Sequence, residues 1–336
     1  MRAGGRYSSS VQETDHAPPR VPRGGAALVF AIVAVLLIPA YLTLRTVEYP
    51  AVLVMTAKNP TPYGYTWSLS LWVVPMLAIL TWLRGHPQYK QPWRSFWSTV
   101  GLLVPMGVLL DLVFGNTFFT FPNSGATLQI FAWGYDLVSG TWLRNIPIEE
   151  FGFYFFGVAV ALLMYLWADM VWFCRYHPRG RFGHPVEPPR VALHWPSALI
   201  GVALIVLATM YKKLLSPDPC GFPGYFTFLV AAAFIPSALL FDSVQSKINW
   251  HAFSFSALVM FTLSMLWEAT IAFPYEWWGY KPHMMIGEFI AAWNGLPVEE
   301  PFLWLLVSFA VVIVFEAIHL LQLSRAQRGA SSIAPP

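Results

Sequence analysis

The sequence contains eight apolar stretches, each close to the length of one membrane crossing. They cover roughly residues 27–45, 66–83, 97–119, 148–173, 193–211, 225–241, 253–273 and 301–323. A transmembrane helix needs about 20 mostly apolar residues. Only 11% of the 336 residues are charged, whereas a soluble domain has about a quarter. We therefore predict an all-α fold, a polytopic membrane helix bundle with about eight transmembrane helices.

The distribution of basic residues predicts the orientation of this bundle. An even number of spans puts both termini on one side, and fourteen of the 20 Lys and Arg residues fall on that side. Cytoplasmic loops carry the excess of positive charge, so we expect an integral protein of the cytoplasmic (inner) membrane with both termini in the cytoplasm. The expected units are a disordered tail (1–25), a four-helix unit (26–176), a linker (177–192), a second four-helix unit (193–324) and a disordered tail (325–336).

The order of local sequence features in spans one to four returns in spans five to eight. The matching pairs are Gly64-Tyr65 with Gly224-Tyr225, Val74-Pro75 with Ile235-Pro236, Leu110-Asp111 with Trp267-Glu268, Trp133-Gly134-Tyr135 with Trp278-Gly279-Tyr280, and Pro147-Ile148-Glu149-Glu150 with Pro297-Val298-Glu299-Glu300. Equivalent features lie four spans apart, and an even number preserves orientation. The sequence therefore predicts two tandem parallel repeats, related by an axis along the membrane normal.

Several classes of function lack support in the sequence. Cys174 and Cys220 are predicted at opposite membrane faces, so no disulfide is expected. There is no GxGxxG or Walker sequence, no Asp-x-x-x-Asp pair, and no Cys/His spacing typical of a metal site. We predict no metal and no nucleic-acid partner. No cofactor is evident, and a requirement for flavin or another cofactor stays open.

The doubled Pro-x-Glu-Glu motif supplies the first candidate catalytic residues, Glu149, Glu150, Glu299 and Glu300. A simpler interpretation is that Pro and Glu only start a helix, because both are favoured in its first turn. A helix start could use many other residues, however. The return of a carboxylate pair at the same place in both halves favours a function.

Two further acids, Asp111 and Glu268, lie inside apolar spans, where an ionisable group is costly and usually functional. A hydrogen bond between helices by a protonated acid is the alternative. An outer loop joins each of these spans to the next, so each acid is expected near the Glu pair of its own half. The aromatic residues around these acids are candidate substrate-binding residues, namely Trp133, Tyr135, Phe153, Trp267, Trp278 and Tyr280.

This combination predicts acid–base chemistry on an apolar substrate. Carboxyl groups clustered in a low dielectric hold a proton, so one can act as general acid and an ionised neighbour as base. Aromatic faces stabilise a nearby cation. A buried acid in an aromatic cavity therefore suits the protonation of an alkene and the guidance of a carbocation, although each aromatic residue could equally serve packing or lipid contact.

At these residues the chain resembles the membrane-embedded lycopene cyclase family, found in bacteria and archaea and fused to phytoene synthase in fungi. The resemblance covers roughly 66–173 and 225–323. It implies an isomerase (intramolecular lyase) of carotenoid biosynthesis that protonates a terminal alkene, closes a ring onto the cation and removes a proton, without net redox change. It also implies Glu149, Glu150, Glu299 and Glu300 as acid/base residues, supported by Asp111 and Glu268.

The expected partners are the lipid bilayer, a linear carotenoid such as lycopene, and, as candidates, other carotenoid biosynthesis enzymes. The ring type, the C40 or C50 substrate, the number of ends cyclised, the division into acid and base, and the oligomeric state stay open. Two other hypotheses also stay open. One is another isoprenoid cyclase or a carotenoid hydratase on the same scaffold, and the other is a proton-coupled transporter.

Overall fold

The computed structural model describes residue 34 and residues 61–177 and 193–331. The predicted first span (27–45), apart from residue 34, and the tail (1–25) lie outside the described residues. So do most of the predicted linker (177–192) and the end of the C-terminal tail. Helices make up most of the described part of the chain.

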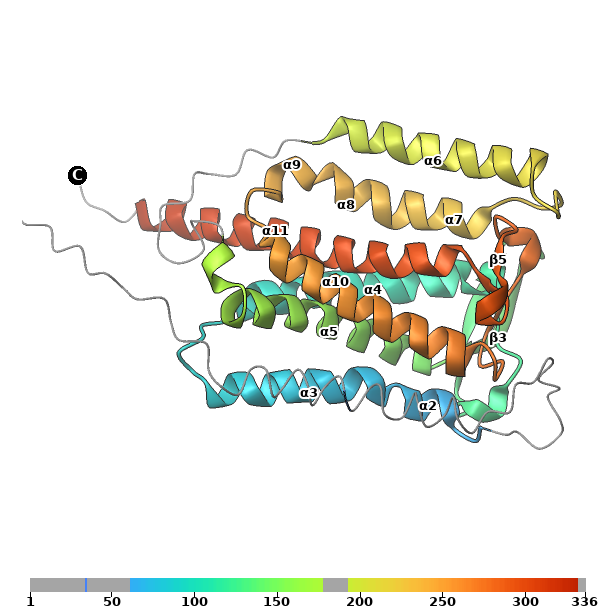
Figure 1. The fold of residues 1–336 in the computed structure, drawn as a ribbon, viewed down its shortest axis with the longest axis horizontal. Helices are drawn as coiled ribbons and strands as arrows, with labels where there is room; N and C mark the ends of the chain where they lie inside the picture. The colour runs from blue at the N-terminus through green and yellow to red at the C-terminus, as the bar shows by residue number, and fades with distance from the viewer. Residues whose placement is uncertain (1–33, 35–60, 178–192, 332–336) are drawn as a thin grey trace, which may run out of the picture.

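The helices run in nearly parallel directions, as Figure 1 shows. They are α2 (Gly64–Ser68), α3 (Ser70–Gly85), α4 (Trp93–Phe118), α5 (Glu149–Val171), α6 (Trp195–Leu214), α7 (Gly224–Leu229), α8 (Ile235–Leu239), α9 (Phe241–Val244), α10 (Trp250–Trp267) and α11 (Glu299–Ser331). Two π-helical segments interrupt this regularity, η3 (Val230–Phe234) between α7 and α8 and η4 (Glu268–Ala272) after α10. Single π turns are rare and often mark functional sites.

Among the described residues, six helical stretches are long and apolar enough to cross a membrane. They are Gly64–Gly85, Trp93–Phe118, Glu149–Val171, Trp195–Leu214, Trp250–Ala272 and Glu299–Gln327. These stretches confirm six of the predicted spans. The predicted span 225–241 forms the shorter apolar series Gly224–Leu239, which is built from α7, η3 and α8. The chain is therefore a polytopic helical membrane protein.

Helix α5 forms the centre of the bundle. It packs against α3, α4, α10 and α11, and its residues 157–171 are all buried. Helix α6 lies at one edge (Figure 1), where it packs against α7, η3 and α8. Its large apolar side chains Leu199 and Leu207 are 72% and 61% exposed, as expected for a helix that faces lipid.

Short strands gather at one end of the bundle, which we call the hairpin end (Figure 1). Strands β2 (Phe131–Asp136) and β3 (Thr141–Pro147) form one antiparallel pair, and β5 (Phe289–Ile290) and β6 (Leu296–Pro297) form another. Strands β1 (Phe119–Thr120) and β4 (Gly279–Tyr280) join the first half of the chain to the second. The described part of the chain is thus mostly helical, as predicted, and the short strand pairs, which the sequence did not predict, supply hydrogen bonds to backbone groups of the loops.

The two hairpins are equivalent in register but differ in length. Phe131 pairs with Pro147 in the first hairpin, and Phe289 pairs with Pro297 in the second. One of the sequence matches between the two halves does not fall on equivalent strands. Trp133-Gly134-Tyr135 lies inside β2, whereas Gly279-Tyr280 forms β4 and pairs with β1. The two Trp-Gly-Tyr sequences therefore occupy different positions, because similar short sequences on either side of a loop of different length need not be aligned.

Candidate active site

A cavity of about 240 Å³ lies inside the bundle, between the two halves of the chain. Its lining is predominantly apolar and comes from α2, α4, α5, α7, η3, α10, η4 and α11. Three of the predicted acids line it, namely Glu150, Glu268 and Glu300. The sequence predicted a group of acids in each half, but the structure brings acids of both halves to one shared cavity.

The cavity is long as well as apolar. On α11 its lining runs from Glu300 through Trp304, Val307 and Ala310 to Val311, a spacing that follows one face of the helix. At 1.5 Å per residue, these eleven steps cover about 16 Å along the helix axis. The acids lie at the hairpin end of this length, and only apolar residues of α11 line its other end.

Glu150 meets a tyrosine from the start of the second predicted span. The Tyr65 hydroxyl donates a hydrogen bond of 2.7 Å to Glu150 Oε1. Tyr65 is 1% exposed, and its ring lies 5.2 Å from that of Trp278 and 6.2 Å from that of Trp267. A donated hydrogen bond favours a carboxylate, so Tyr65 favours the ionised form of Glu150, whereas burial and the nearby Asp111 oppose its charge.

Glu268 and Glu300 form a carboxyl pair. The Glu300 side chain interacts with that of Glu268, and it also faces Tyr225 and Tyr280. The Trp304 indole N–H donates a 2.9 Å hydrogen bond to Glu268 Oε1. No donor among the described residues reaches Glu268 Oε2 or Glu300 Oε1. Two neighbouring carboxyl groups in an apolar site disfavour ionisation of both, so this arrangement favours a proton on the pair.

The π-helical segment η4 begins at Glu268. Its backbone N–H groups bond one residue further back than in an α-helix, so the turn is wider than its neighbours.

Tyr280 lies on β4, outside the spans, and stays a hydroxyl donor. Burial and the carboxyl groups of Glu268 and Glu300 raise its pKa well above the ordinary value.

Asp111 lies beside the cavity rather than on its surface. It is 4% exposed, and no donor among the described residues reaches its Oδ2 atom. It is close enough to interact electrostatically with Glu150, as the sequence predicted for the acid and the Glu pair of one half. Asp111 can therefore affect the charge on Glu150 without contacting a molecule in the cavity.

Glu149 and Glu299 do not line the cavity, in contrast to their neighbours in the chain. Glu149 Oε1 accepts hydrogen bonds from the Leu128 backbone N–H at 2.6 Å and from the Thr66 hydroxyl at 2.5 Å. Glu299 Oε1 accepts one from the Ile286 backbone N–H at 2.6 Å. These two side chains thus fix the loops of the hairpin end, a structural role that the helix-start interpretation of the motif did not include.

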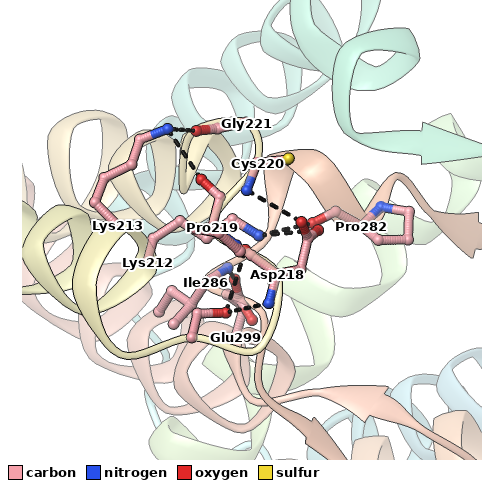
Figure 2. Close-up of polar contacts among 10 residues, drawn as sticks. Lys212, Lys213, Asp218, Pro219, Cys220, Gly221, Pro282, Ile286 and Glu299 are labelled. Carbon is pink, nitrogen blue, oxygen red and sulfur yellow. Dashed lines mark hydrogen bonds and ion pairs between the residues drawn. The ribbon is translucent and has the colours of Figure 1, made fainter.

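A buried lysine contacts the loops of the hairpin end near Glu299 (Figure 2). The Lys212 side chain is 0% exposed, and its ammonium group lies 3.4 Å from Asp218 Oδ2 and 3.5 Å from the Pro282 carbonyl oxygen. It also interacts electrostatically with Glu299. The adjacent Lys213 donates to the carbonyl oxygens of Pro219 and Gly221. Both lysines of α6 therefore hold loops in place.

Four of the six predicted substrate-binding aromatics line the cavity, namely Phe153, Trp267, Trp278 and Tyr280. The other two do not. Trp133 is 58% exposed on β2, and Tyr135 packs against Trp142 of the same hairpin at 5.3 Å. Both were included because they lie near the first Glu pair in the sequence, and the β2–β3 hairpin places them outside the cavity.

Tyr65 and Tyr225 belong to the site, although the sequence analysis used them only as markers of the repeat. Both follow a glycine at the start of a helix, both line the cavity, and both face a glutamate, Glu150 and Glu300 respectively. A tyrosine in an apolar span is itself a signal, because its buried hydroxyl needs a hydrogen-bond partner. The partner is an acid on a distant helix, and only the folded structure identifies it.

An ion pair joins the halves next to the site. Lys281 Nζ lies 2.8 Å from Asp136 Oδ2 and donates to the Asn116 carbonyl oxygen. Burial opposes the charge on Asp136, but hydrogen bonds from Lys281 and the Val138 N–H outweigh it and hold its pKa below the ordinary value. In the described part of the chain, no group of three or more His, Cys, Asp or Glu side chains could hold a metal ion.

Comparison of the chain with protein-family models, curated proteins and solved structures found no match.

Proposed function

We propose that this protein is a carotenoid cyclase that forms the end-group ring of lycopene or a related linear polyene within the membrane. One observation carries the proposal. Glu150, Glu268 and Glu300 converge on a long, predominantly apolar cavity with an aromatic lining. A cavity of this kind accepts a hydrocarbon, and its carboxyl groups can act only as acids, bases or nucleophiles.

In this proposal the Glu268–Glu300 pair is the acid. Two buried carboxyl groups side by side disfavour ionisation of both, and no described residue donates a hydrogen bond to Glu268 Oε2 or Glu300 Oε1 that would favour a second charge. Transfer of the proton of this pair to one carbon of the terminal alkene leaves a cation on the other carbon. The nearby internal double bond of the polyene supplies its electron pair to the cation, which forms the ring bond and moves the positive charge to a ring carbon.

The aromatic rings stabilise this charge. Trp267 and Trp278 line the cavity with ring centroids 4.7 Å apart, and Tyr65 lies against both. A cation over such a face gains about 2 kcal/mol where water is excluded. The same exclusion of water protects the cation from hydration.

Glu150 is then the base. The Tyr65 hydroxyl stabilises its ionised form, and it lies in the same cavity as the acid pair. It removes a proton from a carbon next to the cation, which restores a double bond. One proton enters and one leaves, so substrate and product have equal mass and no oxidant or reductant is needed.

The same proposal includes eight spans arranged as two tandem parallel repeats. Equivalent loop contacts support it. The Leu128 N–H donates to Glu149, and the Ile286 N–H donates to Glu299. In each hairpin, the residue that follows the second strand donates its N–H to the carbonyl oxygen of the residue that precedes the first strand. These pairs are Ile148 with Ile130 and Val298 with Glu288. The proposed location is the cytoplasmic membrane with both termini inside, which the distribution of Lys and Arg supports.

Expression in a lycopene-producing host tests the proposal. We expect cyclic products of unchanged mass, and loss of those products in Glu150→Gln, Glu268→Gln and Glu300→Gln. Asp242→Asn is the matched control, because this exposed carboxylate lies outside the cavity. An unchanged lycopene pool with well-expressed protein would refute cyclisation of that substrate. A product heavier by one water would indicate a hydratase instead.

A further inference from the structure

Lining residues of α4 and η3 are also partly exposed at the surface of the bundle. Met106 of α4 lines the cavity and is also 41% exposed. On η3, Ala232 and Ala233 line the cavity with half-buried, small side chains. Ala310 of α11 lines the cavity and is also only half buried. We take the partly exposed residues Met106, Ala232 and Ala233 to mark the opening of the cavity, and we call this opening the slot.

The pseudo-equivalent place in the other half of the bundle is filled. Trp72 follows Tyr65 by seven residues, just as Ala232 follows Tyr225. Trp72 is 0% exposed, stacks on Trp304 at 5.5 Å and meets Trp267 edge-on at 5.9 Å. An indole therefore fills this place in the first half, whereas the equivalent place in the second half holds only a methyl group.

Aromatic side chains close the slot toward the hairpin end. Phe228 of α7 lies 5.2 Å from Phe114 and 5.4 Å from Phe118, both on α4. Met106 lies eight residues before Phe114, which corresponds to about 12 Å along the helix. The slot thus opens near the middle of α4, where a spanning helix meets the hydrocarbon core of the bilayer.

We propose that the slot admits one end group of a linear polyene from the bilayer while the rest of the polyene stays in the lipid. This inference rests on the proposed function. At about 240 Å³, the cavity is smaller than the roughly 300–1,000 Å³ of sites that enclose a drug-sized ligand. It holds an end group and the adjoining chain, so a long polyene extends out through the slot.

Two features of the cavity select this occupant. Met106, Ala232 and Ala233 offer no polar group to a hydrophilic ligand, whereas the unpartnered carboxyl atoms of Glu268 and Glu300 lie at the closed end. The ligand is therefore apolar along its length and reactive at its tip. The two ends of one polyene are processed in separate binding events, and polyenes of different length with the same end group are accepted alike.

Substitution of Ala232 by tryptophan places an indole there, as in the first half, and tests the slot. The matched control is Ala231→Trp, since Ala231 lies in the same π-helical segment but is exposed and does not line the cavity. Met106→Trp is a second blocking variant on the opposite side of the slot, with Leu109→Trp (60% exposed) as its control on α4. Each purified protein, in lipid nanodiscs with lycopene, is assayed for bound pigment and for cyclic product.

We expect Ala232→Trp and Met106→Trp to reduce both bound pigment and product at least tenfold, and both controls to match the wild type. Equal binding by wild type and both well-folded blocking variants would overturn the slot. Pigment binding that needs the open slot, but without a cyclic product, would support the slot and refute the proposed function. A mixture of a C40 and a C50 substrate with the same end group should give rates within about threefold of each other.

Discussion

Replacement of Glu149 and of Glu150 separates the two roles that the structure gives to adjacent glutamates. Glu149 accepts two hydrogen bonds at 2.6 and 2.5 Å from the Leu128 N–H and the Thr66 hydroxyl, and it is 2% exposed. Glu149→Ala leaves both donors without a partner. An unpaired buried donor costs about 1–3 kcal/mol, and both of these donors are only partly buried, so the lower end of that range for each predicts a fall of about 2 kcal/mol in the free energy of unfolding.

Glutamine at position 149 keeps an oxygen acceptor and should recover most of that stability together with the activity. Glu150→Gln should do the opposite, with stability retained and product lost, because glutamine cannot accept the proton. Thermal unfolding of purified protein and product formation by chromatography measure the two effects separately. If Glu149→Gln were as inactive as Glu150→Gln while its stability matched the wild type, Glu149 would be a reacting group and the assignment would be wrong.

Two further predictions concern the neighbours of the site. Tyr65→Phe removes the 2.7 Å hydrogen bond to Glu150, a charge-assisted bond worth about 1.5–3 kcal/mol, so the rate of product formation should fall about tenfold or more with KM for the polyene unchanged. Tyr63→Phe is the control, since Tyr63 is 48% exposed, and an equal loss there would contradict the prediction. The pKa of Asp136 is lower in the folded protein than in the unfolded chain. Its ionised form therefore stabilises the fold fully at a pH above the unfolded pKa. This contribution is lost as the pH falls through the folded pKa. Unfolding midpoints at pH 6 and below pH 4 should therefore differ more for the wild type than for Asp136→Asn, and equal differences would refute the role of the Lys281 pair.

Much of the architecture could be predicted because it depends on local chemistry. Six apolar runs of membrane length form helices where they were expected, since lipid requires backbone hydrogen bonds to be satisfied within the segment. The starts of α5 and α11 at Glu149 and Glu299 also follow from local preferences for Pro and Glu. The strand pairs of the hairpin end were missed, because they have only two to seven residues each and depend on pairing across loops.

The sequence by itself determined that the chain is a membrane bundle and that Asp111, Glu268 and the two Glu pairs are its unusual residues, because hydrophobicity and intramembrane charge are properties of short segments. Only the tertiary structure decided which acid of each pair faces the cavity. Successive residues on a helix point about 100° apart, so Glu149 and Glu150 cannot face the same partner, and the packing of neighbouring helices selects between them. Tertiary packing also decided that Trp72 is buried against Trp304 and Trp267 while Ala232 lines the cavity, since whether a side chain fills a space depends on helices distant in the sequence.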